Sequence, residues 1–158
     1  MGEQLKSHPQ KRLVAPYEFS GWEVHTVGGI VLKIVADGVG LESDPREFSS
    51  VVDVPGGREE ITLARMADAG IARLFTAEVM PYERPTSAAN PRILSDPIPA
   101  WNVVLRDSVE FEVSADGFQP FEGWIEFFFR VQGEDCEWTE PVLFVQYADL
   151  QSTTLVSM

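Results

Sequence analysis

Two stretches in which apolar and polar residues alternate constrain the fold of this chain more than any other feature. The alternation has a period of two over 108–114 and over 124–131, which is typical of β-strands with one buried face. The apolar positions of the first stretch are Val109, Phe111 and Val113. Those of the second stretch are Ile125, Phe127, Phe129 and Val131. The sequence therefore predicts a β protein whose core includes these side chains.

The segment between the two stretches carries turn signals. Asp116-Gly117 is a dipeptide that favours tight hairpin turns, because both central residues of such a turn need positive φ angles. Pro120 has no backbone N–H, so it belongs in a loop or on a sheet edge. We therefore expect an antiparallel hairpin with a long loop somewhere within 115–123.

The second face of 124–131 is unusual for a strand because it is half apolar. Its residues are Trp124, Glu126, Phe128 and Arg130. A strand that is apolar on both faces either lies centrally in the core or presents one face to a partner. The alternation does not distinguish these two arrangements, so the four residues are interface candidates.

The remaining apolar runs also have the composition of strands and are separated by turn residues. They lie at 30–35, 50–54, 71–79 and 142–147. Residues 59–69 fit a helical stripe slightly better than a strand, and the alternative is two strands joined by a hairpin turn at 67–70. The proline-rich stretch 81–99 predicts a long loop, either a surface crossover or a binding loop. Together these patterns predict a mainly β, single-domain antiparallel β-sandwich of jelly-roll or Greek-key type, with at most one short helix near 59–69.

The length of 158 residues suits one domain. We expect an extended basic N-terminal arm (1–16), a β-sandwich domain (17–150) and a C-terminal tail (151–158). The arm carries three bases, Lys6, Lys11 and Arg12, against one acid, Glu3, so its charge is +2 and it is an interface candidate. No apolar run approaches the ~20 residues of a membrane span, so we expect no membrane association.

The net charge of −13 is concentrated in the second half of the chain. Residues 107–149 hold eleven acids and one base, Arg130. Contact with phosphate needs Lys and Arg, so we expect no direct contact between this acidic body and nucleic acid. Glu110, Glu112 and Glu126 would share an acidic face if the predicted hairpin closes. Such a face could bind Ca²⁺ or act in glycoside hydrolysis, but the solvent side of an amphipathic strand is the simpler interpretation.

Residue types that commonly carry catalysis are scarce in this chain. His8 lies in the basic arm, and His25 lies among apolar residues, where a structural role is the simpler interpretation. Cys136 stands among carboxylates, and we expect an unreactive thiol. We therefore predict no catalytic residue, no cofactor and no metal site. A single cysteine fits a cytoplasmic or intracellular protein, whether free or incorporated into a particle.

Three functions remain open at this point. The first is a non-enzymatic structural or assembly subunit, of the coat, decoration or accessory type. Such a subunit would bind copies of itself or another protein through the arm and the 124–130 face. The second is an acidic binding protein, such as an inhibitor or a nucleic-acid mimic, that occupies a basic site. The third is a carbohydrate-binding or hydrolytic module that uses Trp and carboxylate side chains. We favour the first, because catalytic residue types are few and one strand has two apolar faces.

Overall fold

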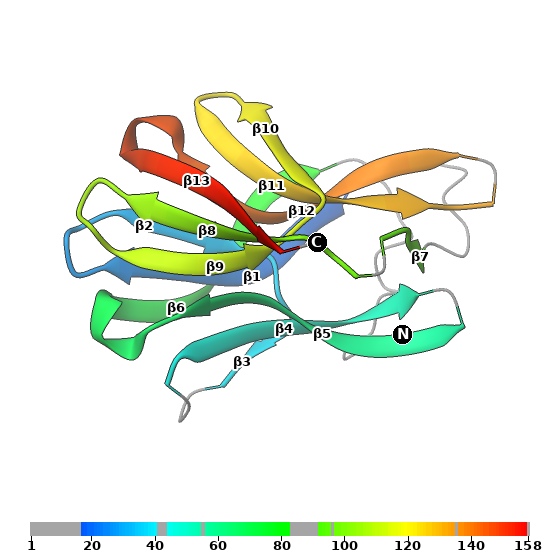
Figure 1. Ribbon diagram of the computed structural model, residues 1–158, viewed down its shortest axis with the longest axis horizontal. Coiled ribbons are helices and arrows are strands. Elements are labelled where there is room, and N and C mark those ends of the chain that lie inside the picture. The colour runs from blue at the N-terminus through cyan, green and yellow to red at the C-terminus, as the bar shows by residue number, and fades with distance from the viewer. Residues whose placement is uncertain are drawn as a thin grey trace.

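The computed structural model describes residues 17–40, 44–54, 56–82, 92–95, 97–134 and 136–157. These residues form two antiparallel sheets that pack face to face as a β-sandwich (Figure 1). The helical elements among them are the 3₁₀ turns η2 (Asp68–Gly70) and η3 (Tyr147–Asp149). The predicted mainly β sandwich is therefore confirmed. No helix in the described part of the chain is long and apolar enough to cross a membrane.

The first sheet, sheet A, has seven strands. Six of them follow one another in the order β10 (Gly117–Phe121), β11 (Trp124–Gln132), β12 (Glu137–Gln146), β2 (Val31–Ile34), β1 (Tyr17–Thr26) and β6 (Ile71–Tyr82). The seventh is the short β7 (Arg92–Ile93), which pairs with β11. The strand predicted at 124–131 is therefore an inner strand, one place in from the edge of its sheet.

The second sheet, sheet B, has six strands. Their order is β13 (Leu150–Ser157), β8 (Ala100–Leu105), β9 (Glu110–Ser114), β5 (Gly57–Met66), β4 (Arg46–Val54) and β3 (Gly38–Val39). In both sheets, the strands up to β6 form one block and most later strands form another. The pairing of β2 with β12 joins the blocks of sheet A, and that of β5 with β9 joins those of sheet B.

A single hydrophobic core fills the space between the sheets. In sheet A, Phe127 lies opposite Leu143, which lies opposite Ile34, and all three are almost fully buried. Sheet B contributes Phe48 and Leu105, which are also fully buried. Complete burial of one such side chain contributes about 1.5–3 kcal/mol relative to exposure, so this cluster is the main source of stability. The predicted core positions are confirmed: Phe111, Val113, Ile125, Phe127, Phe129 and Val131 are buried, and Val109 packs at the margin.

The predicted hairpin between the two alternating stretches is wrong, because β9 belongs to sheet B and β11 to sheet A. The chain changes sheets between Ala115 and Asp116. The Ala115 N–H donates to the carbonyl of Pro99, beside β8, whereas the Asp116 N–H donates to the carbonyl of Phe128 on β11. The partner of β11 is β10, which lies inside the expected loop and holds Pro120 on a sheet edge, as one of the two options for Pro120 predicted.

The turn before β11 uses Glu122 and Gly123, and not Asp116-Gly117. Both Glu122 (φ 49°) and Gly123 (φ 89°) have the positive φ angles that a tight two-residue hairpin turn needs. Gly123 takes such a conformation without steric cost. The chemistry of the predicted turn was therefore right, but its position was wrong.

The favoured helix near 59–69 is also wrong, because 57–66 form strand β5. β4 pairs with β5 along its whole length and β9 pairs with 64–66 on the other edge, and this pairing overrides a weak helical stripe. The alternative of two strands is correct in number. However, β5 and β6 lie in different sheets, and η2 turns the chain from one to the other.

The expected C-terminal tail is almost entirely strand. β13 pairs with β8 along its whole length, and Leu150 at its start packs against the core. The residues lack charge and include β-branched Thr and Val, which suits a strand. The expected N-terminal arm, 1–16, lies outside the described residues, as does the segment 83–91 of the proline-rich stretch.

Candidate functional site

The outer face of β11, predicted as an interface, is largely occupied by contacts within the chain. The Lys33 ammonium of β2 lies 5.3 Å from the centroid of the Trp124 ring, which places a cation over an aromatic face. Glu126 is only 4% exposed and accepts a hydrogen bond from Gln119 Nε2 at 3.2 Å. Burial raises the pKa of Glu126 above its ordinary value, and the hydrogen bond from Gln119 partly opposes this rise.

Phe144 of β12 lies opposite Glu126 and completes a small cluster on the outside of sheet A. It is 2% exposed, and its ring lies 5.9 Å from that of Phe121 on β10. Because Leu143 and Val145 point into the core, Phe144 points to the opposite face of the sheet. The apolar second face of β11 is thus accounted for largely by β10, β12 and β2.

The other two interface candidates on β11 also have partners within the chain. The ring of Phe128 lies close to the backbone of Gly117, where an added Cβ would be 3.2 Å from Cζ. The Arg130 guanidinium is exposed and forms an ion pair with Glu137 at 2.9 Å. This hydrogen bond and the charge of Glu137 raise the pKa of Arg130.

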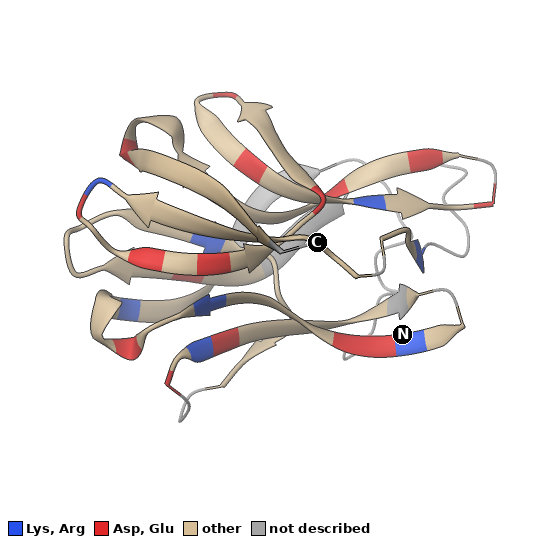
Figure 2. Cartoon of the chain, in the orientation of Figure 1, with Lys and Arg blue, Asp and Glu red and all other residues tan. Residues whose placement is uncertain are grey.

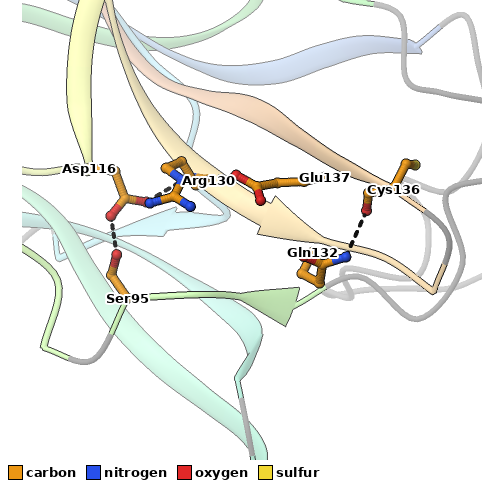
Figure 3. Close-up of polar contacts among 6 residues, drawn as sticks. All are labelled: Ser95, Asp116, Arg130, Gln132, Cys136 and Glu137. Atoms are coloured by element: carbon orange, nitrogen blue, oxygen red, sulfur yellow. Dashed lines mark hydrogen bonds and ion pairs between the residues drawn. The ribbon is translucent and has the colours of Figure 1, made fainter.

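The carboxylate of Asp116 hydrogen-bonds neighbouring segments where the chain passes from sheet B to sheet A (Figure 3). It accepts a hydrogen bond from the Ser95 hydroxyl and another from the Arg130 backbone N–H, the latter at 2.6 Å. Nearby, Gln132 Nε2 donates to the carbonyl of Cys136 at 3.2 Å and closes the β11–β12 turn. These polar residues connect segments of the fold and need no ligand to explain them.

The predicted acidic face does not form. Glu110 and Glu112 lie on β9 of sheet B, whereas Glu126 lies on β11 of sheet A. Glu112 is paired with Arg65 at 3.4 Å, and Arg65 also contacts Glu47 at 3.0 Å. Among the described residues, no group of three or more His, Cys, Asp or Glu side chains is arranged to hold a metal ion.

The hydrolytic arrangement expected from the sequence would need Trp and carboxylate side chains around one cavity. A hollow of about 410 Å³ lies between β5 and the segment before β8, and its lining includes Glu59, Glu60 and Arg65 but no Trp. Trp138 is buried and donates to Glu140 at 2.9 Å. His25 Nε2 is hydrogen-bonded to Glu23 at 2.6 Å, and the His25 ring lies 5.3 Å from that of Phe75.

An exposed apolar surface lies where the edge strands β10 and β13 run along the same side of the sandwich (Figure 1). We call it the β10–β13 side and define it by Phe118, Leu155 and Val156, which are 41%, 43% and 55% exposed. Trp101 connects two of these three residues, and Val156 follows Leu155 where the β13–β8 register is irregular. The Trp101 ring makes an edge contact with Phe118, with 5.4 Å between centroids, and Trp101 is the cross-strand partner of Leu155.

Sequence reasoning missed this surface, because Phe118 was assigned to a loop and 151–158 to a tail. A signal was present in the charge pattern: 117–121 and 150–157 contain no charged residue in an otherwise acidic chain. The basic arm candidates Lys6, Lys11 and Arg12, together with His8, lie outside the described residues. Comparisons with protein families, with curated protein sequences and with solved structures found no match to this chain.

Proposed function

We propose that this protein is a non-enzymatic structural or assembly subunit that associates through its β10–β13 side. The observation that carries the proposal is the exposure of Phe118, Leu155 and Val156 on neighbouring edge strands. Contiguous exposed apolar surface rimmed by polar residues is typical of protein–protein contacts. Burial of such surface contributes about 25 cal/mol per Å² of favourable free energy, so contact with a partner that covers it is stabilised.

The expected contact surface therefore lies on β10 and β13 and not on the outer face of β11. The 124–130 face is weaker support for an interface, because Trp124 and Glu126 already have partners within the chain. The basic arm, 1–16, remains an expected second contact, since its charge of +2 complements an acidic body. The alternative of an acidic inhibitor has less support, because two of the acids of sheet B, Glu112 and Glu47, are paired with Arg65 within the chain.

The test compares Val156→Lys with a matched control, Val27→Lys. Both valines are exposed, at 55% and 62%, but Val27 lies on the turn between β1 and β2, away from the β10–β13 side. Native mass spectrometry and light scattering over a wide range of protein concentration should detect an assembly of the wild type. Val156→Lys should weaken this assembly at least about tenfold, the effect of roughly 1.4 kcal/mol of lost contact and added desolvation, whereas Val27→Lys should not.

Two results would overturn the proposal. One is a wild-type protein that stays monomeric at every concentration and retains no partner protein. The other is an assembly that Val156→Lys and Val27→Lys leave equally intact, since the β10–β13 side would then take no part in it.

A further inference from the structure

Strand β5 extends past the end of its neighbour β9, so part of it lies at an edge of sheet B. Among the described strands, β9 alone approaches β5 on the side away from β4, and it pairs only with 64–66. β9 ends there because the chain passes to sheet A between Ala115 and Asp116. We call residues 57–62, on the side away from β4, the β5 edge. Alternate residues of the β5 edge direct backbone N–H and C=O groups outwards, as at any edge of a sheet.

The hollow of about 410 Å³ lies beside the β5 edge. Four consecutive residues of β5, 59–62, line it, although successive side chains of a strand point to opposite faces. The hollow is therefore at the side of the strand and not over one face. Ser114, the last residue of β9, and Pro97 and Ile98 of the segment before β8 also line it. This arrangement leaves room for a further extended segment in line with β9, and peptides commonly bind at sheet edges in this way.

The charge of the β5 edge indicates which segment fits there. The edge carries Glu59 and Glu60, and Figure 2 shows acidic colour at the start of β5. Neither glutamate forms an ion pair with another described residue, whereas Arg65, which also lines the hollow, is paired with two glutamates of other strands. Arg58 lies opposite Asp53 of β4. Opposite charges that face each other across two strands stabilise the pair, so the β5 edge suits a segment with basic residues.

The basic segment 1–16, which precedes β1, has the composition that this surface requires. Its residues 11–14 are Lys-Arg-Leu-Val, in which two bases are followed by two apolar residues. The bases complement the two glutamates of the β5 edge. The apolar pair suits Val54 and Ile98 in the lining of the hollow. Residues 11–14 therefore match the β5 edge in both charge and polarity.

The segment joins β1 at the end of the sandwich where the β5 edge lies (Figure 1). β1 and β5 each have ten residues, and their last residues lie at one end, where the Val27 N–H donates to the Gly70 carbonyl. Their first residues, Tyr17 and Gly57, therefore lie at the other end. The stretch from Arg12 to Tyr17 spans up to about 17 Å when extended, more than the ~10 Å between packed sheets. The segment can thus reach the β5 edge of its own chain.

We infer that residues 11–14 pair with the β5 edge of the same chain, antiparallel to β5, with Lys11 and Arg12 beside the two glutamates. The direction follows from Tyr17, because the segment must end near the start of β5. The inference goes beyond the proposed function, which needs no such pairing. The same edge of a second copy would serve as the second contact expected of an assembly. However, the short connection to Tyr17 gives the chain's own edge the higher effective concentration.

Hydrogen exchange followed by mass spectrometry measures the pairing of residues 57–62 in the full chain. In the wild type, the amides that face away from β4 should exchange slowly. Lys11→Glu with Arg12→Glu should speed this exchange at least about tenfold, because the segment is then repelled from the acids. The further change of Glu59→Lys with Glu60→Lys should restore slow exchange, because it restores opposite charges across the pair.

A control pair and a dilution series make the test specific. The control is Glu110→Lys with Glu122→Lys, two exposed glutamates outside the lining of the hollow, which should not restore slow exchange to Lys11→Glu with Arg12→Glu. Slow exchange of 57–62 in the wild type should also be the same over a wide range of protein concentration, because the pairing lies within one chain.

Four results would overturn the inference. The first is fast exchange, in the wild type, of the amides that face away from β4. The second is slow exchange that Lys11→Glu with Arg12→Glu leaves unchanged, and the third is a loss that Glu59→Lys with Glu60→Lys restores no better than the control pair. The fourth is slow exchange that is lost on dilution, which would assign the β5 edge to the segment of a second copy. None of these results decides the proposed function, because Val156→Lys tests the β10–β13 side by itself.

Discussion

Replacement of Asp116 tests how the chain is held where it passes from sheet B to sheet A. Its carboxylate accepts hydrogen bonds from the Ser95 hydroxyl and the Arg130 N–H, and both donors approach from different segments. Because Asp116 is only half-buried, water screens these bonds, and we assign roughly 1 kcal/mol to each. Asp116→Ala should therefore lower the free energy of unfolding by about 2 kcal/mol, which corresponds to a fall in Tm of about 4–8 °C for a chain of this size.

Two companion variants separate the proposed cause from general damage. Asp116→Asn keeps an oxygen for the Arg130 N–H and an amide that can donate to Ser95, so it should lose roughly half as much stability. Glu137→Ala removes only the exposed ion pair with the Arg130 guanidinium and should have no measurable effect. Urea unfolding followed by Trp fluorescence measures all three. The reasoning is refuted if Asp116→Ala matches the wild type, or if Asn and Ala destabilise equally.

Two further predictions concern stability and pH. Because burial raises the pKa of Glu126, against the hydrogen bond from Gln119, the folded state retains a proton that the unfolded state has released. Stability should therefore fall as pH rises from the ordinary Glu range through the raised pKa. Glu126→Gln should flatten this fall and stabilise the protein at neutral pH by about 1 kcal/mol, and an unchanged pH profile in urea unfolding would contradict this. Gly28→Ala should cost about 1–3 kcal/mol, because its Cβ would lie 2.3 Å from Asp107 Cβ, whereas Gly38→Ala enters open space. Thermal unfolding compares the two variants, and equal Tm values would count against the clash.

Hydrophobic alternation identified strands and core side chains correctly, because each such judgement needs only neighbouring residues. The buried faces of Phe111 and Phe127 follow from the period of two alone. The same pattern does not reveal which strand pairs with which. Asp116-Gly117 therefore looked like a hairpin turn, although its role is to change sheets, and the true turn at Glu122-Gly123 carries a weaker signal.

The candidate interface was harder to predict than the strands, because its side chains contact residues that are far away in the sequence. Glu126 was expected at the surface with Glu110, yet it is buried against Phe144, and no local pattern predicts that contact. The exposed edge depended on recognising 150–157 as a strand. Its lack of charge was visible in the sequence, but its position at the edge of sheet B comes only from the pairing with β8.

Two strand pairings, β2 with β12 and β5 with β9, join the earlier and later strands of the chain into complete sheets. Strands up to β6 supply three of the seven strands of sheet A and three of the six strands of sheet B, and the later strands supply the rest. At the β2–β12 seam, Ile34 meets Leu143, two residues far apart in sequence. Neither half of the chain can therefore complete a sheet alone, and each would expose an open edge in both layers. The sheets form only when residues far apart in the sequence come into contact. Such topologies fold slowly and unfold cooperatively.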